Sequence, residues 1–147
     1  MPTVNDIVDL LNEKGYRLTT GRRAVVEAVL AGEDLFSVAD VHRHVSRIGR
    51  ATVFRTMKLL VDLDLVCRVQ LEDGSLRYRL RVALEDHHHH LVCTGCGSVE
   101  DFSDCDVGVM SETVADRTKY EIQGHRLELY GLCPACRVAG AGRRGRR

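Results

Sequence analysis

The chain has 147 residues, of which 21 are basic and 21 acidic, and this length suits one ordinary domain or two small ones. Only 5% of the residues are aromatic, so the core is small and a structural metal would help to hold it together. The apolar runs are short and interrupted by charge, which excludes a transmembrane span, and the N-terminus lacks the features of a secretory signal. We therefore expect a cytoplasmic protein with no membrane partner.

Charge divides the chain into three segments. Residues 1–82 carry 13 Lys and Arg against 11 Asp and Glu, residues 83–136 carry 3 against 10, and residues 137–147 carry 5 Arg and no acid. This asymmetry predicts two domains with different partners. We place the first domain at residues 1–82 and the second at 83–137. A disordered basic tail is expected over 138–147, because this segment has little to bury.

Four helices are predicted in the first domain. Apolar residues recur at helical spacing, and Gly15 is expected to end the first helix while Thr19 or Thr20 begins the second. Ser37, with Asp40 three residues later, resembles a capping box at the start of the third. The predicted helices cover residues 4–14, 20–31, 38–47 and 50–64.

Two strands are predicted after the fourth helix. Apolar and polar residues alternate over residues 65–71 and 76–80, on either side of an Asp73-Gly74 turn, which is a strong hairpin signal. Helices followed by such a hairpin form the pattern of a winged helix-turn-helix domain, in which the fourth helix would read DNA and the hairpin would be the wing. A small helical domain with a hairpin and no ligand has the same pattern.

The second domain is predicted to mix helix and strand. Apolar and polar residues alternate over four short segments, and one longer segment has helical spacing. The expected strands cover residues 91–93, 98–102, 120–122 and 126–130, and the expected helix covers 107–117. The predicted fold class is therefore α+β, a winged helix-turn-helix domain followed by a small α+β domain.

Two Cys-x-x-Cys pairs, Cys93 with Cys96 and Cys133 with Cys136, predict a metal site. Each pair places two sulfurs on one tight turn, and four thiolates bind zinc in a closed tetrahedron that is structural and not catalytic. Three disulfides in a secreted protein, or four thiols without metal, are the alternatives. Cys67 lies outside the pairs, as does Cys105, and a lone cysteine is most often a small buried apolar residue.

Four consecutive histidines, residues 87–90, precede the first of these pairs. On an extended strand His87 and His89 face one side and His88 and His90 the other, which predicts two separate metal sites. A solvated polyhistidine run that binds metals weakly is the alternative. Neutral imidazole suits several metals, so the histidines do not choose among them.

Several motifs together resemble the ferric uptake regulator family. The resemblance spans residues 4 to about 137 and implies a dimeric, metal-responsive transcriptional repressor with an N-terminal DNA-binding domain and a C-terminal dimerisation domain. Its motifs are Arg17-Leu18-Thr19-x-x-Arg22, Ala51-Thr52-Val53-Phe54-Arg55, His88-x-His90-x-x-Cys93-x-x-Cys96-Gly97, His125 and Leu132-Cys133-x-x-Cys136. Phe54 stands where the family usually has Tyr.

The resemblance implies three metal sites. The structural zinc site is Cys93, Cys96, Cys133 and Cys136. The regulatory site is His88, His90 and Asp101, to which we add Cys67, because it falls where zinc-sensing members have a ligand. The accessory site is His87, His89 and His125; it usually includes a Glu at the position of Gly108, so here it would need another acid, such as Asp106 or Glu112.

The function predicted from this resemblance is a metal-dependent DNA-binding repressor that senses Zn(II) and controls metal-uptake genes. The all-histidine run resembles the zinc uptake regulators of this family, and a thiolate in the sensing site favours zinc over the harder Mn, so zinc is the expected regulatory metal, with Fe(II) sensing as the alternative. The expected partners are operator DNA and a second copy of the chain, with no small organic substrate. The DNA-contacting residues are expected to be Arg17, Arg22, Arg50, Thr52, Phe54 and Arg55.

Two other classes of function remain open at this stage. A metal-dependent hydrolase would need an open coordination position and a general base, for which Glu85 or Asp86 are candidates. We do not expect an enzyme, because the sequence has no zincin motif and the first domain would have no role. A zinc-storage or redox protein would release zinc when its cysteines are oxidised.

Overall fold

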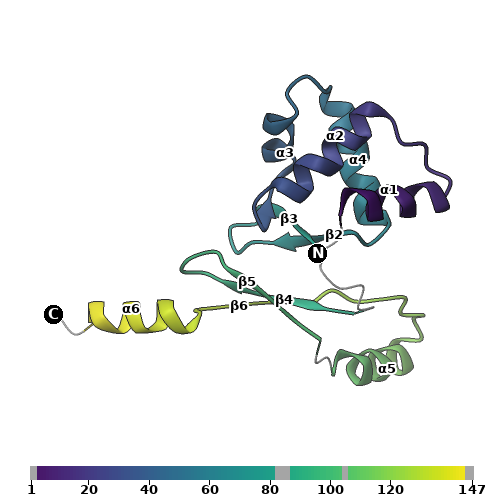
Figure 1. The fold of residues 1–147 in the computed structure, drawn as a ribbon. Helices are drawn as coiled ribbons and strands as arrows, with labels where there is room; N and C mark the ends of the chain where they lie inside the picture. The colour runs from purple at the N-terminus through teal and green to yellow at the C-terminus, as the bar shows by residue number, and fades with distance from the viewer. Residues whose placement is uncertain (1–2, 82–86, 104–105, 145–147) are drawn as a thin grey trace. The chain divides into compact units, whose positions relative to one another are not determined.

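The computed structural model describes residues 3–81, 87–103 and 106–144, with side chains as far as residue 140. The chain forms two compact units, Met1–Leu84 and Glu85–Arg147, and each is described by itself (Figure 1). Glu85, Asp86 and Cys105, which the sequence raised as candidates, lie outside the described residues.

The first unit contains the four predicted helices. They are α1 (Val4–Glu13), α2 (Thr20–Ala31), α3 (Val38–His44) and α4 (Arg50–Asp62). Capping boxes formed by Thr3 with Asp6 and by Ser37 with Asp40 begin α1 and α3, and Gly15 follows α1 with a φ of 78°. The helix α3 is three residues shorter than expected, because the backbone leaves helical geometry at Val45.

The strands of the first unit form a three-stranded sheet in the order β1-β3-β2. The predicted hairpin is β2 (Val66–Gln70) and β3 (Leu76–Leu80), and Gly74 provides the positive φ that its turn requires. The strand β1 (Leu35–Phe36) pairs with Arg79 and Tyr78 and was not predicted, since two residues are too few to show an alternating pattern.

Helices α2 and α4 carry the core of the first unit. The fully buried side chains include Val25, Val26 and Val53, and Met57 and Leu60 are each only 1% exposed. Each such side chain contributes about 1.5–3 kcal/mol through its removal from water. This packing fixes one face of α4 inside the unit and leaves the other face, which carries Phe54, open to solvent.

The second unit is a three-stranded sheet with two helices. Its elements are β4 (His89–Cys93), β5 (Val99–Phe102), α5 (Val107–Thr118), β6 (Glu128–Gly131) and α6 (Pro134–Arg144). The strand order is β5-β4-β6, with β4 antiparallel to β5 and parallel to β6. The histidine strand β4 therefore lies in the centre, with a neighbour on each side. Together the two units confirm the predicted α+β fold class.

Two expectations for the second unit were wrong. Residues 120–122 are irregular and not a strand, and Tyr120 is 76% exposed. Polar and apolar residues alternate over this segment, but alternation alone does not form a strand, because a strand also needs a neighbour to pair with. Residues 138–144, expected to be part of a disordered tail, continue the helix α6. Alanine and arginine are strong helix formers, and here they outweigh the cost of two glycines. No helix in the described segments is long and apolar enough to cross a bilayer.

Candidate metal centres

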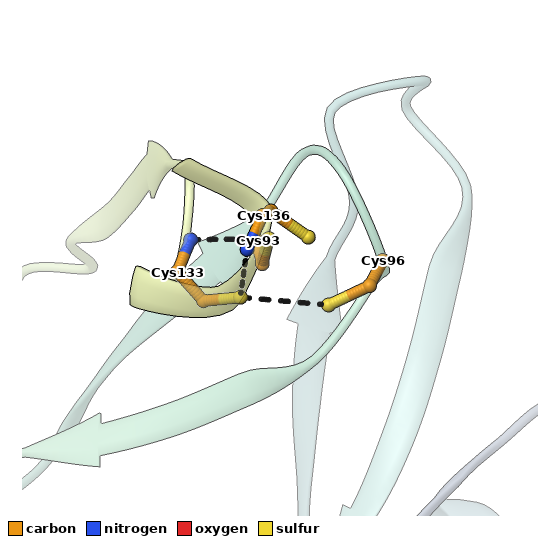
Figure 2. Close-up of side chains that lie close together, drawn as sticks. All are labelled: Cys93, Cys96, Cys133 and Cys136. Atoms are coloured by element: carbon orange, nitrogen blue, oxygen red, sulfur yellow. Dashed lines mark hydrogen bonds between the residues drawn. The ribbon is translucent and has the colours of Figure 1, made fainter. Parts of the chain in front are cut away.

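The four paired cysteines converge on one point. Cys93 ends β4, Cys96 lies in the turn before β5, and Cys133 and Cys136 lie at the start of α6 (Figure 2). Their sulfur atoms all lie within 4.8 Å of one another, and the Cys96 and Cys133 Sγ atoms are 3.9 Å apart. Two sulfurs bound to one zinc at about 2.3 Å in a tetrahedron would be about 3.8 Å apart. The four residues therefore fit a zinc ion.

These four cysteines form no disulfides in the structure. A disulfide would bring two sulfurs to about 2.05 Å, and all the described cysteines are free of such bonds. The backbone N–H of Cys133 donates to the Cys93 sulfur over 3.3 Å and, together with backbone donors in the Cys96 turn, lowers the pKa of Cys93 to about 6. The neighbouring Cys133, Cys96 and Cys93 sulfurs raise the pKa of Cys136 to about 12. A divalent cation would allow all four to be thiolates together.

Gly95 lets the two cysteine turns approach each other. A Cβ atom at Gly95 would lie 2.9 Å from the Cys136 Sγ and 3.0 Å from its Cβ. Both distances are shorter than packed carbon and sulfur atoms tolerate, so any side chain here would displace the second pair. Glycine is therefore required at this position by the closeness of Cys136.

The histidines divide between two groups as their parity predicts. The ring centres of His87 and His89 are 4.4 Å apart, and those of His88 and His90 are 5.1 Å apart. The segment is thus extended, and each pair has its own surroundings. This arrangement argues against a solvated polyhistidine run, since His89 and His90 are only 2% and 6% exposed.

His125 joins His87 and His89 in a three-histidine group. The Nε2 atom of His89 is 2.8 Å from that of His87 and 3.4 Å from that of His125. Burial lowers the pKa of His89, and the neighbouring His87 and His125 side chains lower it further, which favours the neutral form that binds metal.

The fourth ligand suggested for this group from the sequence stays a prediction. A side chain at Gly108 would meet nothing within 4 Å, and this ligand group contains neither Asp106 nor Glu112 among the described residues.

His90 lies between two carboxylates. Asp101 on β5 is its register partner, and the His90 Nε2 and Asp101 Oδ1 atoms are 3.9 Å apart. On the other side, the His90 Nδ1 atom is 3.9 Å from Oε1 of Glu128 on β6. Glu128 was not predicted. It alternates with Leu127 and Leu129 and so reads as a solvent-facing residue, whereas its side chain is only 8% exposed.

Cys67, proposed from the sequence to share a metal with His88 and His90, belongs to the first unit. It is half-buried on β2, and its thiol donates to the backbone carbonyl of Arg79 over 3.5 Å. Its role as a ligand stays a prediction.

The exposed face of α4 carries several of the predicted DNA-contacting residues. Phe54 is 62% exposed and Arg50 begins the helix. The Arg55 Nε atom donates to the carbonyl of Ala51 over 3.1 Å, which leaves the terminal amino groups able to meet an acceptor outside the helix. Thr52 is half-buried, and a Cβ atom at Gly21 of α2 would lie 3.3 Å from its methyl group.

Arg22 lies in the first turn of α2, and Arg17 lies in the segment that precedes this helix. The Arg22 guanidinium donates to the backbone carbonyl of Arg17, so the two residues are held together. The predicted basic residues therefore come from α4, from α2 and from the segment before α2, all in the same unit.

Comparison with known proteins gives consistent matches. A sequence model described as the ferric uptake regulator family matches residues 13–130. The ferric uptake regulation protein of Bacillus subtilis (strain 168) is 37% identical over 139 residues, covering 90% of this chain and 93% of its own. The solved ferric uptake regulator of Vibrio cholerae is 30% identical with a TM-score of 0.59, covering 87% of this chain and 100% of its own. A zinc uptake regulator solved with zinc and DNA has a TM-score of 0.75 over 94% of this chain and 95% of its own; at 20% identity it shows a shared fold.

Proposed function

Because the chain belongs to the ferric uptake regulator family of DNA-binding metalloregulators, we propose that it is a homodimeric repressor that senses zinc and controls metal-uptake genes. Membership in the family makes it a transcription regulator and not an enzyme. The observation that carries the finer proposal is that one strand, β4, supplies donors to chemically different ligand groups: sulfur at Cys93, and imidazole on both of its faces.

The four-cysteine group is the structural zinc site. Four thiolates fill a tetrahedron, so no position remains for water or substrate. Zinc there would join the turn after β4 to the start of α6, two segments that are 37 residues apart between Cys96 and Cys133. Its role is to hold the small second unit together, in which the described buried apolar residues are Val92 and Cys93.

The regulatory ligands are His88, His90 and Asp101, with Cys67 completing a tetrahedron. A metal held by residues of both units would favour one orientation of the winged helix over others. In a dimer, only one spacing of the two recognition helices matches half-sites about 34–36 Å apart. Metal binding would thus increase the population of the form that binds DNA.

Zinc is proposed over iron on the chemistry of the donors. A thiolate from Cys67 and imidazoles from His88 and His90 suit zinc well. Fe(II) is the second candidate, because two carboxylates, Asp101 and Glu128, lie beside His90 and because the Bacillus subtilis relative is named as a ferric uptake regulation protein. Oxygen donors suit harder metal ions than thiolates do.

The helix α5 supports a homodimer. The structure describes all the residues of this helix, and none of them is buried. They include two apolar side chains, Val109 and Met110, which are 69% and 59% exposed. On β4 and β6, Leu91 and Leu129 are also more than 40% exposed. A helix of this composition is stabilised by covering its apolar residues, and a second copy of the chain would do so.

We propose that Phe54 and Arg55 face the bases and that Arg17, Arg22 and Arg50 contact phosphates. An exposed arginine can donate two bonds to guanine, and an aromatic ring can touch a thymine methyl group. Thr52, which is half-buried against α2, would contact DNA through its remaining exposed surface.

The experiment that tests the proposal is a comparison of metals in DNA binding. The protein, with its tightly held zinc in place, is titrated onto a labelled fragment of its own promoter in the presence of Zn(II), Fe(II) under anaerobic conditions, or Mn(II). Zinc is expected to activate binding at the lowest free concentration. If Fe(II) alone activates DNA binding, the regulatory metal is iron and not zinc. If no metal changes DNA binding, the proposal of metal regulation is rejected.

A further inference from the structure

Glu128 is a buried acid placed beside a proposed metal ligand. In the parallel pairing of β4 with β6, Glu128 is the register partner of His90. Its Oε1 atom lies 3.9 Å from the His90 Nδ1 atom, and both side chains are 8% exposed. A buried carboxylate is costly unless its oxygens have polar partners, so its location next to His90 calls for an explanation.

The two ring nitrogens of His90 face different carboxylates. Nε2 is 3.9 Å from Asp101, whose side chain is 48% exposed, and Nδ1 is 3.9 Å from the buried Glu128. A neutral imidazole carries its proton on one nitrogen and offers the other to a metal. Two ligand atoms of one tetrahedral zinc lie about 3.4 Å apart, so Nε2 and Asp101 are close to the separation that a shared ion requires.

We propose that Glu128 is a positioning residue for the regulatory metal. Its carboxylate faces the Nδ1 atom of His90 at 3.9 Å, and by closing to hydrogen-bond distance it would accept the Nδ1–H and so fix the tautomer in which Nε2 is presented, together with Asp101, to the ion. A carboxylate behind a metal-bound histidine also raises the basicity of the ring. This inference rests on the proposed role of His90 as a regulatory ligand, and it assigns to Glu128 no direct bond to the metal.

Tyr130 holds the carboxylate of Glu128 in place. Its hydroxyl donates to Oε2 of Glu128 over 3.1 Å, and it lies two residues further along the same strand, so both side chains are on one face of β6. With Oε2 engaged by Tyr130, Oε1 is the oxygen that faces His90. The three residues form a chain from the hydroxyl through the carboxylate to the imidazole.

The test uses the full-length protein with its structural zinc and compares Glu128→Leu, Glu128→Gln and Tyr130→Phe with wild type. Glu100→Gln is the matched control, because Glu100 is an exposed acid on β5, the strand that pairs with β4 on the side opposite β6. The first measurement is the ¹⁵N chemical shifts of His90, with and without added zinc, which report the tautomer. The second is the affinity of the regulatory site for zinc, by competition with a chelator.

Wild type and Glu100→Gln are expected to keep the proton of His90 on Nδ1. Glu128→Leu should lose this preference and bind regulatory zinc about 10–100-fold more weakly, as expected for the loss of an outer-shell carboxylate. Glu128→Gln, whose amide oxygen still accepts a hydrogen bond, should keep the tautomer and lose less affinity. The zinc affinity of Tyr130→Phe should lie between that of the control and that of Glu128→Leu.

Identical His90 shifts and zinc affinity in wild type and Glu128→Leu would overturn the inference. A zinc-bound Nδ1 atom in wild type would also overturn it. The shifts measured without added zinc test the tautomer even if wild type binds no second ion. If wild type binds no second zinc ion, the proposed regulatory site is rejected. This outcome is distinct from a failure of the role proposed for Glu128. Retained structural zinc and an unchanged circular dichroism spectrum show that each variant is folded.

Discussion

At the scale of single residues, the structural zinc site depends on the absence of a side chain at Gly95. The Cβ of an alanine there would lie 2.9 Å from the Cys136 Sγ atom, too close for the four sulfurs to keep their positions. By contrast, a Cβ at Gly131, which lies at the end of β6, would meet nothing within 4 Å. The two glycines therefore form a matched pair.

Gly95→Ala is expected to weaken zinc retention, while Gly131→Ala should leave it nearly unchanged. Forcing an extra methyl group into a packed site costs about 1–3 kcal/mol, which corresponds to about a 5–160-fold faster loss of zinc to a competing chelator if the cost falls on the bound state. The measurement is the rate of zinc release to a coloured chelator. Equal rates for the two variants would show that the approach of Cys136 to Gly95 is not required.

The residues of the site differ in how far the sequence could predict them. The convergence of Cys93, Cys96, Cys133 and Cys136 follows from two local turns, and the separation of the histidine pairs follows from strand parity, so both are visible in the sequence. Glu128 was missed because its position beside His90 depends on the register between β4 and β6, which no local pattern contains.

At the scale of elements, α3 owes its start to a reciprocal cap. The Asp40 amide donates to Ser37 Oγ over 3.1 Å, and the Asp40 carboxylate accepts from the Ser37 amide over 2.8 Å. The hydrogen bonds from the side chain and backbone of Ser37, supported by Arg43, lower the pKa of Asp40 to about 2. This helix positions α4, so its cap contributes to the surface proposed to bind DNA.

Ser37→Ala should lower the free energy of unfolding of the first unit by about 1 kcal/mol, as for other helix caps.

The Asp40 pKa falls from 3.8 to about 2 on folding, so its stabilisation is fully present above pH 3.8 and is lost as the pH falls toward 2. The stability difference between wild type and Asp40→Asn, measured by urea unfolding, should therefore shrink as the pH falls from about 4 toward 2. A difference that stays constant over this range would contradict the cap.

The apolar residues of α5 give a prediction about assembly. Replacing Met110 by Glu should weaken the homodimer at least tenfold, because a charge would be buried without a partner if this helix is covered by the second copy. Glu112→Gln, an exposed change on the same helix, is the control. Analytical ultracentrifugation over a range of concentrations measures both. A Met110→Glu dimer as stable as wild type would place the interface elsewhere.

Local chemistry explains which elements the sequence predicted. Helices α1 and α2 and the hairpin have their own caps and turn, so their boundaries are within two residues of expectation. Residues 120–122 failed because a strand needs a neighbour as well as alternation. The helix α6 was missed because a segment rich in Gly and Arg was judged by what it can bury, although Ala and Arg favour helix in isolation.

At the scale of the whole molecule, the proposed function joins a DNA-binding surface to a metal site. Arg55→Ala should reduce operator affinity by about 1–3 kcal/mol if the residue contacts a base. Lys58→Ala is the control, because Lys58 lies on the same helix and is engaged by Asp62 over 2.6 Å. The affinity of each variant for operator DNA and for unrelated DNA is measured by fluorescence anisotropy at two salt concentrations. Equal losses for the two variants would mean that the recognition surface is wrongly placed.

The central claim is that metal at His88, His90, Asp101 and Cys67 switches DNA binding on, while the four-cysteine zinc only supports the fold. The most direct measurement is operator affinity as a function of buffered free zinc for wild type, His88→Ala and Cys67→Ser, with the zinc content of each protein determined beforehand. All three should retain about one zinc per chain. Wild type should bind DNA more tightly as free zinc rises, whereas both variants should require more than tenfold higher zinc. If His88→Ala and Cys67→Ser respond to zinc as wild type does, the regulatory site is not the one assigned here.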